Sequence, residues 1–165
     1  MRSKNISEFH TTVMLAKDEA RAGGSRKVEA EHVLLALSRQ DGTDAREILE
    51  SVGLDRAAIL EAIERESEQS LRAVGVTLGD KDLVKATDAR DFEPRFGQSA
   101  KLALRRGADL EARRVAPPLE PIHLLLGVLY AKAGTVPRIL AISGVDAGDL
   151  TGKAEKALSQ RRQCA

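Results

Sequence analysis

Hydrophobic positions at the start of the chain follow the spacing of an α-helix. Apolar residues recur every three or four positions at Ile6, Phe9, Val13, Ala16 and Ala20, which places them on one helical face. The glycines at 23–24 then end the pattern. A second run, residues 31–39, is apolar around most of its circumference. A helix of this kind is typical of the interior of a bundle.

Two more helices complete a four-helix unit. The third is predicted over residues 44–52 and ends at Gly53, where glycine adopts a left-handed conformation at little cost. Asp55 is predicted to cap the fourth helix, residues 56–70. In that helix the apolar positions face inward and the glutamates largely face water.

The same unit returns 91 residues later without a gap. The matching pairs are His32 and His123, Leu34 and Leu125, Leu35 and Leu126, Ile48 and Ile139, Leu49 and Leu140, Gly53 and Gly144, and Asp55 and Asp146. Apolar matches alone could arise by chance between amphipathic helices, but the helix-ending glycines and the following aspartates coincide as well. The sequence therefore predicts a duplication, with second-unit helices near 98–113, 121–131, 135–143 and 147–160.

These patterns predict an all-α protein of two four-helix repeats. The first repeat covers residues 1–70 and the second residues 96–160; 71–95 form a linker packed on the bundle, and 161–165 form a tail. No strand alternation stands out in the sequence, so no strand is expected in either repeat.

Composition fits a folded globule, with 42% hydrophobic and 31% charged residues. Because only 2% are aromatic, the core has to consist of Leu, Ile, Val and Ala. The net charge is +1, divided into −4 for residues 1–95 and +5 for residues 96–165. A nucleic-acid-binding protein would show a strong basic excess or stacking aromatics. We therefore expect no nucleic-acid partner, and we interpret Arg105–Arg106 and Arg113–Arg114 as a solvated helix face.

The sequence also bears on location. No segment approaches the roughly 20 apolar residues that span a bilayer, and the N-terminus lacks the apolar core of a signal peptide. The single cysteine, Cys164, cannot form an internal disulfide, which favours a reducing compartment. We expect a cytoplasmic monomer that has no membrane partner.

Short segments in both halves resemble the N-terminal domain of Clp-type AAA+ unfoldases, which is a double four-helix repeat. The segments "AEHVLLAL" and "PIHLLLGVL" are similar to the family's "TEHLLLGLL", and "ILESVGLD" and "ILAISGVD" are similar to its "VLENLGVD". The resemblance covers about residues 5–158. It implies a pseudo-twofold helical fold and a role in docking adaptors and protein substrates. Because the chain stops after the second repeat, we expect a stand-alone domain without the ATPase rings.

In ClpC-like members of this family, the glutamate of each "TEH" takes part in binding phosphorylated arginine. Glu31 retains that position, Ala30 replaces the threonine, and Ile122 occupies the glutamate position of the second half. The resemblance therefore implies at most one such contact, at Glu31. A carboxylate in a first helical turn is also stabilised by the helix dipole, so a structural role for Glu31 carries equal weight.

No catalytic, cofactor or metal site is predicted. His32 and His123 lack further ligands at metal-binding spacing that repeat in both units, so they are assigned to the repeated core with Leu34, Leu35, Leu125 and Leu126. The segment "AGDLTGKA" lacks the first glycine and the hydroxyl of a Walker A loop. We expect a non-catalytic module that binds protein or peptide; the alternative is a small-molecule-binding protein or a repurposed enzyme on the same scaffold.

Overall fold

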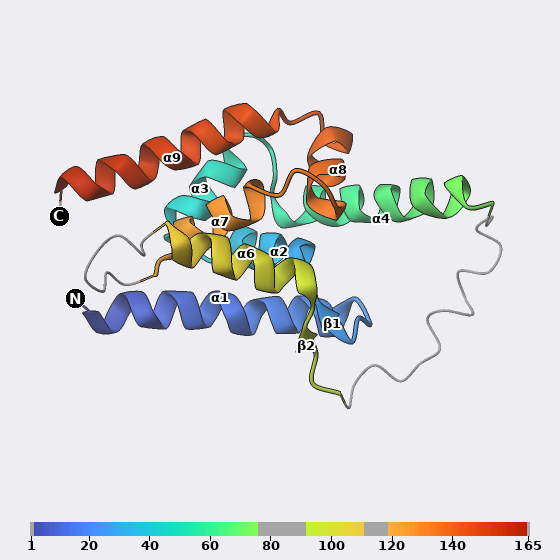
Figure 1. Ribbon diagram of the computed structural model, residues 1–165, viewed down its shortest axis with the longest axis horizontal. Coiled ribbons are helices and arrows are strands. Elements are labelled where there is room, and N and C mark those ends of the chain that lie inside the picture. Colours follow the sequence, from blue (N-terminus) through green and yellow to red (C-terminus); the bar gives the residue numbers. More distant parts are fainter. Residues whose placement is uncertain (1, 76–91, 111–118, 165) are drawn as a thin grey trace.

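The computed structural model describes residues 2–75, 92–110 and 119–164 (Figure 1). The helices of the first half are α1 (Arg2–Ala22), α2 (Ala30–Arg39), α3 (Asp44–Glu50) and α4 (Arg56–Ala73). Those of the second half are α6 (Gln98–Asp109), α7 (Pro121–Leu129), α8 (Thr135–Ile142) and α9 (Ala147–Cys164). Helices α2 and α7, α3 and α8, and α4 and α9 begin 91 residues apart. The predicted all-α class is confirmed.

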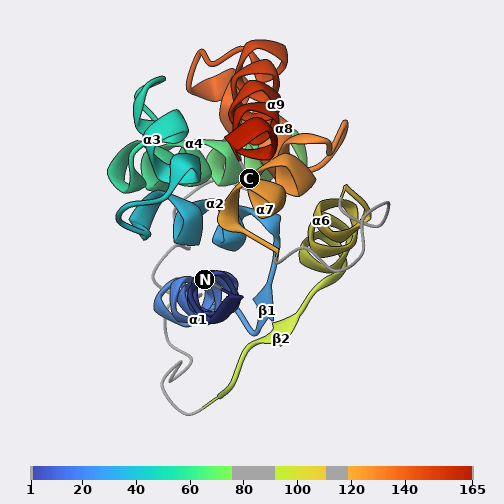
Figure 2. The same cartoon turned by 90° about the vertical axis from the view of Figure 1, so that its left-hand side faces the viewer.

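The two halves pack on each other through reciprocal contacts. Helices α2 and α7 lie next to each other in the middle of the molecule, with α1 and α6 on one side and the remaining helices on the other (Figure 2). Helix α4 of the first half packs on α8, and the equivalent helix α9 of the second half packs on α3. Reciprocal contacts of this kind are those expected across a twofold axis, here within one chain.

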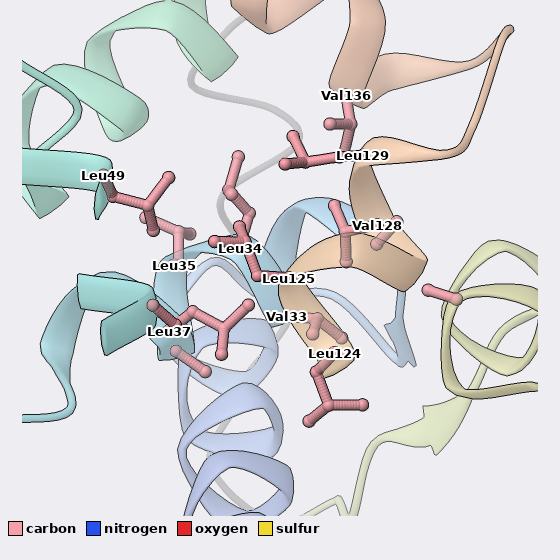
Figure 3. Packing of buried hydrophobic residues seen from close by; sticks show 14 of the residues in the cluster. Val33, Leu34, Leu35, Leu37, Leu49, Leu124, Leu125, Val128, Leu129 and Val136 are labelled. Atoms are coloured by element: carbon pink, nitrogen blue, oxygen red, sulfur yellow. The ribbon is translucent and has the colours of Figure 1, made fainter. Parts of the chain in front are cut away.

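The core forms where α2 and α7 meet. Leu34 and Leu35 of α2 and Leu125 and Leu126 of α7 are each at most 2% exposed, and Figure 3 shows leucines of both helices pointing into the interior. All nine residues of α7 are buried. The histidine-led run occurs twice because each copy supplies one of the two central helices of a shared core.

The helix boundaries follow the predicted signals. Gly53 and Gly144 have φ angles of 76° and 69°, in the left-handed region where a side chain would be strained. Oδ1 of Asp55 accepts a hydrogen bond from the amide of Ala58 at 2.8 Å, and Oδ1 of Asp146 accepts one from the amide of Asp149, also at 2.8 Å. Both the glycine and the aspartate predictions are confirmed.

The expectation that neither half contains a strand is wrong in one detail. Strands β1 (Lys27–Val28) and β2 (Arg95–Phe96) form a parallel pair. The amide of Gly97 donates to the Val28 carbonyl at 2.9 Å. Two residues are too few to show alternation, so the sequence pattern carries no signal for this pair. The pairing holds the segment before α2 against the segment before α6.

The fourth helix of each half is longer than predicted. Helix α4 continues to Ala73, and α9 continues to Cys164 through the residues assigned to a tail. Arg161 on α9 donates to Glu120 at 2.7 Å and to Asp44, which links this end of the helix to both halves. Most of the predicted linker, residues 76–91, lies outside the described residues, as do 111–118.

Candidate functional site

A cavity of about 290 Å³ opens where the first helical turn of α2 meets the second half. The first half contributes Glu29 and Glu31, and α6 contributes Ser99 and Arg106. The end of α7 and the start of α8 close the remaining side with Ala131, Gly134 and Val136. The cavity therefore has two carboxylates on one side, a guanidinium on another, and small or apolar side chains between them.

Glu29 and Ser99 join the N-termini of α2 and α6 at the edge of this cavity. Oε2 of Glu29 accepts a hydrogen bond from the amide of Ser99 at 3.1 Å and lies against the Ser99 hydroxyl. Oγ of Ser99 accepts one from the amide of Ala30 at 2.9 Å. Each residue thus satisfies a first-turn amide of the other half's helix. A Cβ atom at Gly97 would collide with the Glu29 carboxylate, so a larger residue there would displace this carboxylate from its present position.

Glu31 lines the cavity from the second residue of α2. Burial raises the pKa of its carboxyl group, and the nearby carboxylates of Glu29 and Glu66 raise it further. A hydrogen bond from the backbone of Glu31 itself and the charge of Arg138 act in the opposite direction. Arg138 donates to Glu66 at 2.6 Å. No side chain among the described residues donates a hydrogen bond to Glu31. The Glu31 carboxylate is therefore half-buried and can accept hydrogen bonds from a ligand.

Arg105 and Arg106 were both predicted to be solvated, and this is correct for Arg105 only. Arg105 is exposed, whereas Arg106 is half-buried and lines the cavity. Successive residues on a helix point about 100° apart, so Arg106 turns toward the cavity while Arg105 points to solvent. The pair Arg113–Arg114 lies outside the described residues.

His32 and His123 perform the same structural task in the two halves. Nδ1 of His32 accepts a hydrogen bond from the Glu29 amide at 2.9 Å, and Nδ1 of His123 accepts one from the Glu120 amide at 3.0 Å. An imidazole nitrogen that accepts is unprotonated. Burial lowers the pKa of His32, against the opposing effect of Glu29 and Glu19. The repeated histidine thus completes the first turn of each central helix.

The second half presents no carboxylate at the position equivalent to Glu31. Ile122 is 2% exposed and belongs to the core. Of the residues that surround the cavity, sequence reasoning found only Glu31. Glu29 was detectable, because Glu120 stands 91 residues after it and both precede a histidine by three. Gly97 and Ser99 could not be found from the repeat, because the residues 91 positions before them are Ile6 and Glu8, which are of different types.

Other candidate chemistry has a structural explanation. The segment "AGDLTGKA" forms the first two turns of α9, so the prediction that it begins a helix is confirmed. Among the described residues, no group of three His, Cys, Asp or Glu side chains could hold a metal ion. Within the same residues, every helix is too short or too polar to cross a membrane.

Comparisons with known proteins agree with this architecture. Residues 7–88 match the family model described as "Clp repeat (R) N-terminal domain". The chain is also similar to the crystal structure of the N-terminal domain of the caseinolytic protease associated chaperone ClpD from Arabidopsis thaliana. That match has a TM-score of 0.63 and 17% identity, and it covers 90% of each chain. No curated protein matches the sequence. Residues 7–88 therefore belong to the family of Clp repeat N-terminal domains, and the described residues of both halves share the all-α fold of the ClpD domain.

Proposed function

We propose that this protein is a docking module that binds segments of other proteins without transforming them, and that a cationic side chain of the bound segment enters the cavity beside Glu31. One observation carries the proposal: a half-buried carboxylate, that of Glu31, lines a cavity between the two halves and receives no hydrogen bond from a neighbouring side chain among the described residues. A guanidinium placed there would supply charge-assisted hydrogen bonds, which are stronger than neutral ones.

The charges around the cavity favour a ligand that carries both signs. Glu29 and Glu31 lie on the α2 side, and Arg106 lies on the α6 side. A phosphorylated arginine side chain combines a guanidinium with a phosphate, so its cationic part can meet Glu31 while its anionic part lies near Arg106. This arrangement supports a phosphoarginine-type contact at Glu31.

The shape of the cavity supports a protein partner over a small molecule. Sites for drug-sized ligands usually enclose about 300–1,000 Å³ with a few convergent polar groups. The present cavity, about 290 Å³, is at the lower end of this range, and its lining contains charged side chains of both signs, as polar parts of protein interfaces do. A single side chain of a partner fits such a depression, with flanking residues on the surrounding surface. Clients or adaptors of a Clp protease are the partners we propose.

The proposal is tested by isothermal titration calorimetry with a peptide containing phosphorylated arginine. The wild-type protein, Glu31→Gln and Glu64→Gln are compared; Glu64 is an exposed glutamate on α4 and undergoes the same chemical change. We expect Glu31→Gln to weaken binding by about tenfold or more, because hydrogen bonds to charged groups contribute about 1.5–3 kcal/mol. We expect Glu64→Gln to bind like the wild type.

Thermal denaturation separates a binding role from a structural one. Glutamine has nearly the shape of glutamate, so Glu31→Gln should melt close to the wild-type temperature. If the wild-type protein fails to bind the peptide, or binds it no better than Glu31→Gln does, then Glu31 is a helix-start residue and the docking surface lies elsewhere.

A further inference from the structure

The positions that line the cavity beside Glu31 have counterparts 91 residues away in the repeat, and several of these counterparts carry different side chains. We compare each cavity residue with the residue at the equivalent position of the other half, 91 residues away. Ala131 corresponds to Gln40, Ala103 to Thr12, Gly134 to Thr43 and Glu31 to Ile122. The first three changes each add a polar side chain, and the fourth removes a charge. All four of the replacing residues are buried: Gln40 is 7% exposed, Thr43 4%, Ile122 2% and Thr12 0%.

Gln40 is the counterpart of Ala131. It lies just after α2, and its side chain turns back to α1. Nε2 of Gln40 donates to the carbonyl of Glu8 at 2.9 Å, and Oε1 lies against the hydroxyl of Thr12. The Thr43 hydroxyl donates to the carbonyl of Gln40 at 2.9 Å. A buried amide is stable only with its hydrogen bonds made, and here both ends of the amide have partners.

In the second half the equivalent space stays open, because Ala131 ends in a single methyl group. Ala131 is half-buried and lines the cavity. Ala103 offers no hydroxyl in place of that of Thr12. The backbone carbonyl of Ser99 is the equivalent of the Glu8 carbonyl, so one of the two anchors for a glutamine amide also exists in the second half. Among the three positions where a small residue of the cavity is replaced by a polar one, the exchange of Ala131 for Gln40 adds the longest side chain.

We infer that the side chain of Gln40 fills the space equivalent to the cavity and in this sense acts as a plug. The residue at position 40 or 131 then decides whether the docking cavity of that repeat is open. The inference rests on the proposed function for its ligand, a peptide with a cationic side chain. It extends that function by assigning one binding cavity to each chain and by naming an uncharged position of the cavity lining that controls access. Binding should accordingly show a stoichiometry of one peptide per chain.

The direct test introduces the plug into the open cavity. Ala131→Gln is compared with Lys132→Gln, which places the same side chain at the adjacent exposed position. Calorimetry with the arginine-phosphorylated peptide should show an affinity reduced by about tenfold or more for Ala131→Gln, because the cavity that buries the ligand side chain is occupied. Lys132→Gln should bind like the wild type. Equal affinities for Ala131→Gln and the wild type would overturn the inference, and so would two peptides bound per wild-type chain.

A crystal structure of Ala131→Gln separates this inference from the proposed function. If the wild-type protein does not bind the peptide, the proposed function fails, but the plug is still tested by where the new amide lies. We expect Nε2 of the introduced glutamine to donate to the Ser99 carbonyl and the cavity to be filled. A side chain directed into solvent, with the cavity unchanged, would disprove the assignment of Gln40.

Discussion

His32 and His123 each accept, through Nδ1, a hydrogen bond from the backbone amide three residues earlier, at 2.9 and 3.0 Å. The bond requires a neutral imidazole. For His32, burial lowers the pKa below the ordinary value of 6.5. The unfolded chain therefore takes up a proton at this residue more readily than the folded chain, and the resulting contribution to stability is complete above about pH 6.5 and is lost as the pH falls.

Because the lowered pKa of His32 makes the folded state less stable in acid, stability should fall with decreasing pH in the wild-type protein. Between about pH 7.5 and pH 5.5 the wild-type protein should lose free energy of unfolding, and His32→Gln should lose less, because the glutamine oxygen accepts the same bond without titrating. Urea denaturation at both pH values measures the difference. All other titrating groups are present in both proteins, so their contributions to the pH dependence cancel when the two losses are subtracted. An equal loss in both proteins would mean that His32 does not contribute to the pH dependence.

Leu35→Ala and Leu126→Ala should destabilise the protein by similar amounts, about 2–5 kcal/mol each, as truncations of buried leucines do. The two leucines are 2% and 0% exposed at equivalent positions of the two central helices. Leu102→Ala is the control, because Leu102 is 38% exposed and should cost much less. Denaturant melts give all three values, and a neutral effect at either buried position would contradict equivalent burial.

Gly97→Ala should destabilise the protein by about 1–3 kcal/mol, the range typical of overpacking. The added methyl group would meet the Glu29 carboxylate and disturb its bond to Ser99. Gly152→Ala is the matched control: Gly152 lies within α9, and a Cβ atom added there would meet nothing within 4 Å. Alanine at that position should stabilise the helix by up to about 1 kcal/mol. Thermal melts should shift in opposite directions for the two variants.

Glu19→Gln should lower stability at neutral pH and reduce its loss in acid. Glu19 is buried, and its carboxylate accepts hydrogen bonds from Arg39 at 2.7 Å and from Arg56 at 3.0 and 2.9 Å. Burial alone would raise the pKa of Glu19, but the two guanidinium groups outweigh it and the pKa falls below 4.5. The stabilisation is thus present above about pH 4.5 and disappears as the pH falls through the lowered pKa.

Hydration of the two arginines limits how much stability Glu19→Gln should lose. The side chains of Arg39 and Arg56 are 39% and 43% exposed and can be hydrated once the carboxylate is gone, so we expect a loss of about 1–3 kcal/mol at neutral pH. Urea melts at about pH 7 and pH 3 provide the measurement. A difference between wild type and Glu19→Gln that stays constant over this range would show that the ion pairs do not stabilise the fold.

Much of the fold was predictable because its signals are local. Gly53 and Gly144 end their helices, Asp55 and Asp146 begin the next ones, and the repeat fixes the register between them. The longer extent of α4 and α9 was missed, since their last turns lack an apolar stripe and Arg161 is held by residues distant in sequence. Helical periodicity cannot report such contacts.

The candidate site was only partly predictable. Glu31 was found through the family resemblance, but the partners around it come from three separate stretches of sequence. Ser99 faces Glu29 because the pair β1–β2 places two helix starts together, and neither strand is long enough to be read from alternation. Gln40 looks like an ordinary loop glutamine in the sequence. Its importance emerges only when its buried position is compared with that of Ala131.

The exchange of hydrogen bonds between Glu29 and Ser99 links the folding of the two halves. Helix α2 in the first half has an amide satisfied by the second, and α6 in the second half has an amide satisfied by the first. Packing of α4 on α8 and of α9 on α3 is shared in the same way. Neither half can therefore melt without exposing the helix ends and apolar faces of the other, so the double repeat should unfold as one cooperative two-state unit.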